Sequence, residues 1–542
     1  MTTIDTRPFD DQQPGTSGLR KKVKQFRQPH YLENFIQSIF NTIAPCEGKT
    51  LVIGGDGRYY NEQAIQTIIK MAVANNFEKL LIGQGGILST PAASCLIRKY
   101  ATDGGIILSA SHNPGGPDED FGVKFNAANG APAPEGLTQS ISQHTKLITQ
   151  YRIARLEDID LDEICLFQHG NTQIEIVSAV DDYAQLMASL FDFDSIKALF
   201  KSGSFKMCFD AMHAVTGGYA TTILQQQLGA QPGTVINAIP LADFGGGHPD
   251  PNLIHAHELV EQMQAGNGIA FGAASDGDGD RNMILGEDFY INPCDSLAVI
   301  AANAHLIPAF SGGLTGVARS MPTSRAVDRV ASALGIECYE TPTGWKFFGN
   351  LLDDGRIQLC GEESFGTGAN HVREKDGLWA VLCWLNIIAE HKSTPEEILR
   401  SHWQNYGRDY FTRHDYEAVD SEQAAKLFDA LQQQLPNLSG RQVCGNVVSH
   451  ADNFSYVDPV DHSTSSNQGV RILFENGARI VLRLSGTGTK GATLRVYYDA
   501  YEKPDGHLDL NPQEVLKKLI ACADEIAGIY KYTGRSQPDV IT

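Results

Sequence analysis

The chain is short of positive charge. Of its 542 residues, 43 are lysine or arginine and 64 are aspartate or glutamate, which gives a formal net charge of -21. So acidic a protein is a poor partner for nucleic acid, and it repels an anionic substrate at long range. We therefore expect no nucleic-acid partner, and we expect any phosphate site to be locally basic.

The sequence also lacks disulfide motifs and long apolar runs. Its ten cysteines form no C-x-x-C pair, and a chain of this length needs no disulfide framework. The most apolar stretch, residues 378–385, falls far short of the ~18 residues that cross a membrane and predicts a buried helix. Residues 1–20 lack the apolar segment of roughly 7 to 15 residues found in signal peptides. We expect a cytoplasmic protein with reduced thiols and no membrane partner.

Short apolar runs that end in glycine or polar loops recur along the first three quarters of the chain. They occupy residues 51–53, 106–108 and 207–209, and each precedes a helix-compatible segment. This alternation predicts parallel or mixed sheets with ligands at the carboxyl ends of the strands. Since the length exceeds the ~250 to 300 residues of one core, we expect three α/β domains, at residues 1–181, 182–292 and 293–407.

The last part of the chain has a different pattern. Apolar runs at residues 471–474 and 479–482 flank Asn476-Gly477, which is a strong hairpin turn signal. Asn511, Pro512 and Glu514 are typical of a helix start. Residues 408–542 are therefore predicted to form an α+β domain with an antiparallel sheet.

A serine lies in a glycine-rich turn directly after the apolar run 106–108. Residues 109–116 read SASHNPGG, so Ser111 stands beside His112 where a strand ends. A serine in such a turn often bonds only to its own backbone, but at this place Ser111 is a candidate nucleophile. His112 is a candidate to orient groups or carry a proton. Lys124 alternates with apolar neighbours, so it is either a solvated strand lysine or a base near Ser111.

Three carboxylates occupy alternate positions in residues 276–281, which read DGDGDR. Asp276, Asp278 and Asp280 are separated by glycines that let all three face one hard cation. A calcium EF-hand is an alternative, but Arg281 stands where that loop needs glycine, and a strand rather than a helix precedes it. A solvated acidic turn is the other alternative. Magnesium bound for phosphoryl transfer fits best.

Two further loops carry polar groups, and two other features have structural explanations. Residues 361–366, GEESFG, offer a carboxylate and a hydroxyl suited to sugar hydroxyls. Residues 483–489, RLSGTGT, suit a dianionic phosphate, and Arg495 is a further candidate to contact it.

The pair Gly55 and Gly57 begins like a dinucleotide fingerprint but lacks its third glycine. Trp379 and Trp384 are predicted to pack in the core.

These motifs together resemble the phosphoglucomutase branch of the α-D-phosphohexomutase family. The resemblance is carried by residues 16–20, 109–116, 276–281, 342–346, 361–366, 373–377 and 483–488, in family order. It covers the chain from residue 16 to its end. It implies three α/β domains and an antiparallel fourth domain around a central cleft, in agreement with the pattern of strands and turns.

The resemblance also assigns roles to individual residues. It implies that Ser111 carries a phosphoryl group and that Mg2+ is held by Ser111, Asp276, Asp278 and Asp280. His112, Lys124 and Lys375 are implied in acid and base chemistry. The implied contacts to substrate are Arg20, Ser111, Asp280, Arg281, Thr343, Gly344, Glu362, Ser364, Lys375, Arg483, Ser485, Gly486, Thr487 and Arg495.

The implied reaction interconverts glucose 1-phosphate and glucose 6-phosphate through glucose 1,6-bisphosphate, in a monomer or weak dimer. Ser109 stands where the family has threonine, which keeps the hydroxyl, and the loop at residues 489–491 differs more. The alternatives are a relative that acts on mannose or glucosamine phosphates, a non-catalytic sugar-phosphate binder, and a magnesium-dependent phosphatase.

Overall fold

The computed structural model describes residues 1–15, 17–488 and 491–542, without the side chains of residues 486–488. Thr16 and the loop residues Thr489 and Lys490, named above, therefore lie outside the described residues. The chain divides into two compact units. The first comprises residues 1–293, 303–314 and 344–396, and the second comprises residues 294–302, 315–343 and 397–542.

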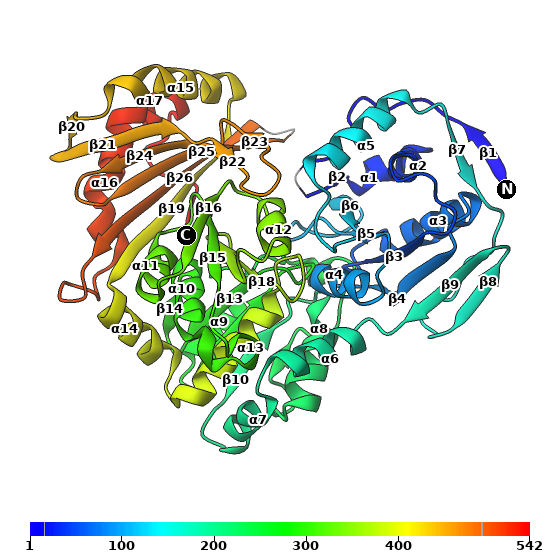
Figure 1. The fold of residues 1–542 in the computed structure, drawn as a ribbon, viewed down its shortest axis with the longest axis horizontal. Helices are drawn as coiled ribbons and strands as arrows, with labels where there is room; N and C mark the ends of the chain where they lie inside the picture. The colour runs from blue at the N-terminus through cyan, green and yellow to red at the C-terminus, as the bar shows by residue number, and fades with distance from the viewer. Residues whose placement is uncertain (16, 489–490) are drawn as a thin grey trace. The chain divides into compact units, whose positions relative to one another are not determined.

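The first unit contains a seven-stranded mixed sheet with the order β2-β6-β5-β3-β4-β9-β8 (Figure 1). Its strands are β2 (Leu19–Lys22), β3 (Thr50–Gly55), β4 (Lys79–Ile87), β5 (Gly104–Leu108), β6 (Asp120–Ala127), β8 (Leu166–His169) and β9 (Thr172–Val177). Its helices are α1 (Val23–Phe26), α2 (Tyr31–Thr42), α3 (Asn61–Ala74), α4 (Thr90–Lys99) and α5 (Glu135–Leu147), and β1 (Thr2–Asp5) pairs with β7 (Gln150–Ile153).

Both faces of this sheet are covered, which explains the continuous apolar runs of its central strands. Ile53 and Ile106 belong to the core that α2 and α3 share with the sheet. Ile107 points to the other face, where α4 packs on β3 and β5. Because β3, β4, β5 and β9 run parallel, the loops after β3 and β5 meet at one edge of the sheet.

A second mixed sheet in the first unit has the order β11-β10-β12-β13-β14. Its strands are β10 (Met207–Asp210), β11 (Val235–Ile236), β12 (Phe271–Ser275), β13 (Asn282–Gly286) and β14 (Phe289–Ile291). Helices α6 (Asp181–Leu190), α7 (Phe193–Lys201), α8 (Thr216–Ala220), η1 (Thr221–Gln227), η2 (Phe244–Gly246) and α9 (His257–Gln264) belong to the same region, and η3 (Ala304–Leu306) and η4 (Pro308–Phe310) follow later in the chain.

The remainder of the first unit is built around a buried helix. Strands β17 (Leu359–Glu362) and β18 (Gly366–Ala369) pair antiparallel, and α12 (Lys346–Asp353) and α13 (Gly377–His391) complete it. Residues 378–385 lie within α13, as predicted, and Trp379 and Trp384 are 1% and 0% exposed. Both tryptophans are therefore core residues, and the prediction for them is confirmed.

The second unit contains a seven-stranded antiparallel sheet with the order β20-β21-β24-β25-β26-β19-β27. Its strands are β19 (Arg408–Val419), β20 (Gln442–Val443), β21 (Asn446–Asn453), β24 (Val470–Phe474), β25 (Arg479–Gly488), β26 (Gly491–Glu502) and β27 (Val540–Ile541). Helices α15 (Ser421–Gln434), α16 (Pro512–Ala527) and α17 (Ile529–Thr533) accompany it, with η5 (Leu435–Asn437) and the pair β22 (Tyr456–Val457) and β23 (Thr464–Ser465). The predicted antiparallel sheet is confirmed, and β24 and β25 flank the Asn476-Gly477 turn.

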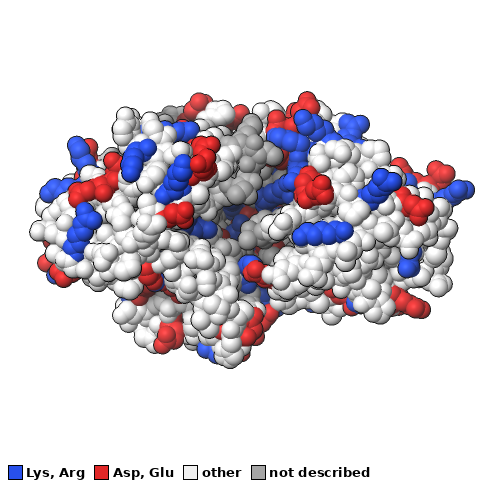
Figure 2. Space-filling view, turned by 90° about the horizontal axis from the view of Figure 1, so that it is seen from above, with Lys and Arg blue, Asp and Glu red and all other residues white. Residues whose placement is uncertain are grey.

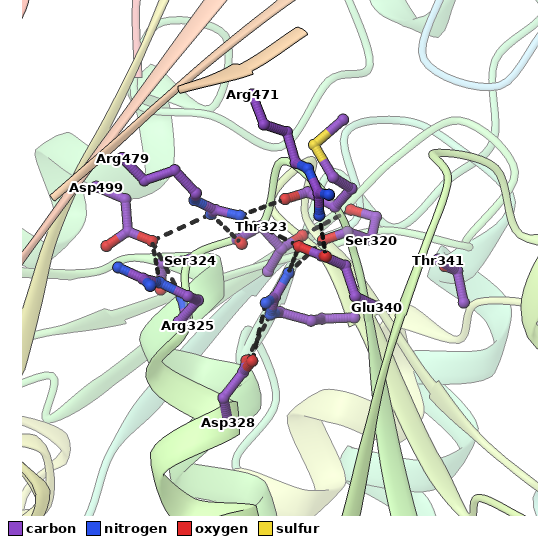
Figure 3. A network of polar contacts seen from close by, with 12 residues as sticks. Ser320, Thr323, Ser324, Arg325, Asp328, Glu340, Thr341, Arg471, Arg479 and Asp499 are labelled. Carbon is purple, nitrogen blue, oxygen red and sulfur yellow. Dashed lines mark hydrogen bonds and ion pairs between the residues drawn. The ribbon is translucent and has the colours of Figure 1, made fainter. Parts of the chain in front are cut away.

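Two parallel strands, β15 (Gly316–Ser320) and β16 (Glu337–Thr341), and helix α11 (Ala326–Leu334) also belong to the second unit, while α10 (Pro293–Asn303) and α14 (Pro395–Tyr406) lie mostly within it. Figure 3 shows a polar network that joins β15 and α11 to the antiparallel sheet. The fully buried Arg479 of β25 donates to the carbonyls of Met321 and Thr323 at 2.6 and 2.7 Å and pairs with Asp499 at 3.1 Å. A buried guanidinium needs such partners, so this network fixes the two substructures to each other.

Figure 2 shows acidic and basic side chains interspersed on the face it draws, with wide uncharged areas between them. No helix among the described residues is long and apolar enough to cross a membrane.

Candidate active site

The loop after β5 holds Ser111 in a left-handed backbone conformation, with φ 54°. A non-glycine residue adopts this conformation only where its surroundings enforce it, at a cost of ~1 to 3 kcal/mol. The Ser111 amide donates to the Ser109 hydroxyl at 2.7 Å, and that hydroxyl donates to Asp56 at 2.6 Å. Arg58 donates to the Ser111 carbonyl at 2.7 Å. Hydrogen bonds to its amide and carbonyl therefore hold the backbone of Ser111 in place.

Asp56 and Arg58 form an ion pair that is 0% exposed on both sides, with a 2.9 Å separation. Arg58 also donates to the carbonyls of Asn113 and Asp120, at 3.3 and 2.9 Å. The sequence analysis missed this pair, because it used the glycines around it only to reject a dinucleotide site. Their position in the sequence could have indicated the site, because two charged residues that directly follow the buried strand β3 lie at the same sheet edge as the loop after β5.

We expect Asp56→Asn to destabilise the fold by about 3 to 5 kcal/mol, because it leaves the Arg58 cation buried without its counter-ion. Urea unfolding monitored by tryptophan fluorescence measures this change. Ser109→Ala is the matched variant, since it removes one hydrogen-bonding hydroxyl and keeps the ion pair, so we expect a loss of only about 1 kcal/mol. Equal free energies of unfolding for the two variants would show that the Asp56–Arg58 pair does not stabilise the loop.

The aspartate loop joins β12 to β13, and both of its neighbours are strands. Asp276, Asp278 and Asp280 are all buried, and their ligand atoms lie within 4.8 Å of one another. Two backbone amides, those of Asp280 and Arg281, donate to Asp276 at 2.9 and 3.1 Å. The EF-hand and the solvated turn are both excluded, because an EF-hand needs flanking helices and these carboxylates are not solvated.

The serine loop and the aspartate loop are in direct contact. The Ser111 hydroxyl donates to Asp276 at 2.9 Å. A Cβ on Gly277 would lie 2.4 Å from the Ser111 carbonyl oxygen, so only glycine fits there. This close approach brings Ser111, the predicted nucleophile, into contact with Asp276, a predicted metal ligand 165 positions away.

The carboxylates have different charge environments. Burial, followed by the charges of Asp280 and Asp278, raises the pKa of Asp276 well above its usual value. Burial also disfavours ionised Asp278, but the ion pair with Lys124 and a 2.7 Å hydrogen bond from Thr90 outweigh it and lower the pKa of Asp278. Clustered buried acids of this kind are stabilised in their ionised forms by a bound cation.

The donor set fits a divalent cation. Oδ1 of Asp278 and Oδ1 of Asp280 are buried and have no hydrogen-bond partner among the described residues. Carboxylate and hydroxyl oxygens are the ligands of hard cations such as Mg2+, Mn2+ and Ca2+. Asp276, Asp278, Asp280 and Ser111 therefore form a candidate metal centre.

Lys124 of β6 is buried and pairs with Asp278, so it is not a solvated strand lysine. Burial lowers the pKa of Lys124, but the charges of Asp278 and Asp280 outweigh this and raise it. His112 is half-buried, with Nδ1 3.4 Å from the Ser111 hydroxyl oxygen. Burial, followed by the nearby charge of Arg281, lowers the pKa of His112 well below its usual value. At neutral pH the lysine is a cation and the histidine is neutral.

Three more cationic groups approach the same loops. Lys375 lies 3.1 Å from Asp280, and Arg281 pairs with Asp250 at 3.2 Å. Arg20 of β2 is opposite Gly122 of β6, and burial lowers its pKa. Asp250 and Thr90 were not predicted from the sequence, because neither stands in a motif that points to this loop.

Lys375 is oriented by the start of α13. Asp376 accepts hydrogen bonds from Tyr183 at 2.6 Å and from the Trp379 amide at 3.0 Å, and His371 lies 2.9 Å from it. The next amide, that of Gly377, donates to the Gly279 carbonyl of the aspartate loop at 3.1 Å. The start of α13 and the aspartate loop are thus joined by a backbone hydrogen bond.

The GEESFG loop lies beside the aspartate loop. The Asn282 amide donates to the Phe365 carbonyl at 2.9 Å, and Arg281 bridges to Gly366. Glu362 is buried and accepts from the Gly344 amide at 3.0 Å, while Ser364 is partly exposed. The structure therefore brings Glu362 and Gly344 together, within the same unit as Ser111 and the three aspartates.

The predicted phosphate loop belongs to the second unit, as does Thr343. Arg483 and Arg495 are directly opposite each other on β25 and β26, and Ser485 is opposite Thr493. Like charges in that position repel, and an anion would relieve the repulsion. Arg495 lies 3.5 Å from Asp415, and Arg483 donates to the Tyr497 hydroxyl at 3.4 Å. The backbone of Gly486 and Thr487 lies in β25, but their side chains are outside the description.

Comparison with protein families gives matches over four consecutive segments. Three are described as the α/β/α domains I, II and III of phosphoglucomutase/phosphomannomutase, at residues 11–152, 181–288 and 293–406. The fourth, at residues 408–539, is described as the C-terminal domain of phosphoglucomutase-1.

Individual relatives are similar over the whole chain. A phosphoglucomutase of Rhizobium radiobacter is 58% identical over 542 residues and human phosphoglucomutase-1 is 52% identical over 560, each with 100% of both chains covered. The open form of the Paramecium exocytosis-sensitive phosphoprotein parafusin, a phosphoglucomutase, matches with a TM-score of 0.93 at 50% identity, covering 100% of this chain and 99% of that one. A phosphoglucomutase/phosphomannomutase family protein of Burkholderia thailandensis shares the fold at 17% identity, with a TM-score of 0.65 and coverage of 94% and 97%. The chain therefore belongs to the phosphoglucomutase/phosphomannomutase family, and within it to the phosphoglucomutases.

Proposed function

We propose that the chain interconverts glucose 1-phosphate and glucose 6-phosphate through a phosphoserine at Ser111 and a glucose 1,6-bisphosphate intermediate. The observation that carries this proposal is the hydrogen bond from the Ser111 hydroxyl to Asp276, within a buried cluster of three carboxylates. Full-length identity to phosphoglucomutases supports glucose as the sugar. The chain is then an isomerase that works by intramolecular phosphoryl transfer.

The proposed cycle has two transfers. In the first, the free hydroxyl of the sugar phosphate loses its proton and attacks the phosphorus of phosphoserine, the bond to the Ser111 oxygen breaks, that oxygen takes up a proton, and the bisphosphate forms. The intermediate then reorients. In the second transfer, the Ser111 oxygen attacks the other phosphate, which restores the phosphoserine and releases the isomeric monophosphate.

The residues around Ser111 have different roles in the two proposed transfers. Lys124 and Lys375 supply positive charge to the transferring group, and the neutral His112 is placed to accept a proton from the Ser111 side. Mg2+ held by Asp276, Asp278, Asp280 and Ser111 would neutralise charge on the phosphoryl oxygens. Four basic groups, Arg20, Lys124, Arg281 and Lys375, also offset the acidic field of the protein as a whole.

Sugar and phosphate contacts complete the proposal. Glu362, Ser364 and Thr343, beside Gly344, are assigned to the sugar hydroxyls, since a reorienting sugar needs donors and acceptors that serve both poses. Arg483, Ser485, Gly486, Thr487 and Arg495 are assigned to the phosphate that is not reacting. For the residues of the second unit this assignment rests on the family resemblance and on the opposed arginines.

Sugar preference separates this proposal from its alternatives. We expect purified protein with Mg2+ and a trace of hexose bisphosphate to convert glucose 1-phosphate at least about tenfold faster than mannose or glucosamine 1-phosphate, since positioned hydroxyl contacts discriminate strongly. Coupled assay of each 6-phosphate measures this. Comparable turnover of all three sugars would contradict a glucose preference, stoichiometric release of inorganic phosphate would indicate a phosphatase, and binding without turnover would indicate a non-catalytic binder.

A further inference from the structure

The β20–β21 hairpin of the second unit turns through Cys444 and Gly445, which have φ angles of 45° and 83°. Two consecutive positive φ angles characterise a tight turn that favours asparagine and glycine. A cysteine at the first of these positions is unusual, and the turn places it at the surface. Of the ten cysteines, all within the described residues, Cys444 is the one that is exposed.

A second thiol lies directly beneath this turn. Cys522 of α16 is 0% exposed, and its Sγ donates to the carbonyl of Val443 at 3.6 Å. The Cys522 thiol therefore contacts the residue that precedes Cys444, and the Cys444 thiol donates to Glu525 at 3.2 Å. Cys522 and Glu525 are three residues apart on α16, so both face the turn.

We propose that Cys444 and Cys522 form a reversible disulfide that ties the hairpin turn to α16, and that Glu525 restrains its formation. The exposed thiol is the point of entry for an oxidant, and the buried thiol beneath the turn is the resolving partner. This pair lies in the second unit and contains none of the residues assigned to catalysis or binding.

The oxidant is a small disulfide such as oxidised glutathione. The Cys444 thiolate attacks one glutathione sulfur, which forms a mixed disulfide and expels the first glutathione thiolate. The Cys522 thiolate then attacks the Cys444 sulfur and expels the second. In total, two protein thiols lose two hydrogens and two electrons, and one oxidised glutathione becomes two reduced glutathiones.

Glu525 sets the rate through the protonation of Cys444. Desolvation, followed by the contacts with Cys522 and Glu525, raises the pKa of Cys444 to about 12. Since the thiolate is the attacking form, the carboxylate keeps the pair reduced under mild oxidation at neutral pH. The rate should therefore rise about tenfold per pH unit between pH 7 and 9.

The disulfide would also stabilise the domain. It joins residues 444 and 522, so it closes a loop that contains β21, β24, β25 and β26. Such a cross-link restricts the unfolded chain and raises the free energy of unfolding relative to the reduced protein. The melting temperature of the oxidised wild type should therefore exceed that of the reduced protein.

The experiment treats the full-length protein with oxidised glutathione at pH 7, 8 and 9 and follows intact mass and disulfide-linked peptides. We expect loss of two hydrogens, a linked 444–522 peptide and a higher melting temperature that dithiothreitol reverses. Glu525→Gln should accelerate formation about threefold for each unit by which the thiol pKa falls. Cys165→Ser, a control on a partly exposed cysteine of the first unit, should behave as wild type.

Cys444→Ser and Cys522→Ser should each prevent the cross-link. Cys444→Ser, at the surface, should leave mutase activity and the thermal stability of the reduced protein close to wild type. A glutathione adduct on Cys444 that never resolves would overturn the disulfide. A Cys444 linkage to another cysteine would do the same. Slower or unchanged formation in Glu525→Gln would overturn the role assigned to Glu525.

Discussion

Ser111→Ala is expected to lower kcat by more than about four orders of magnitude, because it removes the oxygen that carries the phosphoryl group between the two transfers of the proposed cycle. The substitution deletes one hydroxyl and keeps the backbone contacts of the loop, so the fold should survive. Steady-state assay with glucose 1-phosphate measures the loss. Intact mass of wild type exposed to glucose 1,6-bisphosphate should show one added phosphoryl group that the variant never acquires.

Ser109→Ala is the control for this prediction. Its hydroxyl accepts a hydrogen bond from the Ser111 amide at 2.7 Å and is not the proposed carrier, so the variant should still become phosphorylated and should retain measurable turnover. Near-normal activity in Ser111→Ala would refute a covalent enzyme. Phosphorylation of Ser109 in place of Ser111 would show that Ser109 is the nucleophile and that the assignment to Ser111 is wrong.

The second large effect is expected at the metal centre. Asp280→Asn should weaken Mg2+ binding and lower kcat about 10²- to 10³-fold, because it removes a proposed charged ligand whose Oδ1 has no hydrogen-bond partner among the described residues. Chelation should abolish turnover of the wild type, and Mg2+ should restore it. Calorimetric titration with Mg2+ measures binding independently of activity.

Asp250→Asn is the matched control for Asp280→Asn. Asp250 is a nearby carboxylate that pairs with Arg281 and stands outside the cluster of three. Its substitution should leave the Mg2+ affinity close to that of wild type. If both variants lose Mg2+ equally, the ligand assignment is wrong; if chelated wild type keeps full activity, the reaction needs no metal.

Several residues of the site could be identified from the sequence because their chemistry is local. Ser111 and the three aspartates stand in glycine-rich loops after buried strands, and in a parallel or mixed sheet such loops gather ligands. The hairpin at Asn476-Gly477 was predictable for a similar reason, since that dipeptide favours one tight turn.

Other features depend on contacts between residues far apart in the sequence. Thr90 donates to Asp278 across 188 positions, and Ser109 donates to Asp56 across 53. No local pattern marks Asp56, Thr90 or Asp250 as parts of this site. For Lys124 the local pattern left two interpretations open, a solvated strand residue or a base near Ser111, and the fold buries it against Asp278.

The sequence by itself determined the reactive groups, the strands and turns that carry them, and the family. The tertiary structure decided which groups meet and in what charge state. Sheet order brings the loops after β3 and β5 together, and packing between two sheets of the first unit adds the loop after β12. The buried Asp56–Arg58 pair holds Ser111 in a backbone conformation that serine rarely adopts. The physical reason is that backbone preference and side-chain chemistry are properties of short segments, whereas burial, ion pairing and pKa shifts arise only from neighbours supplied by the folded chain.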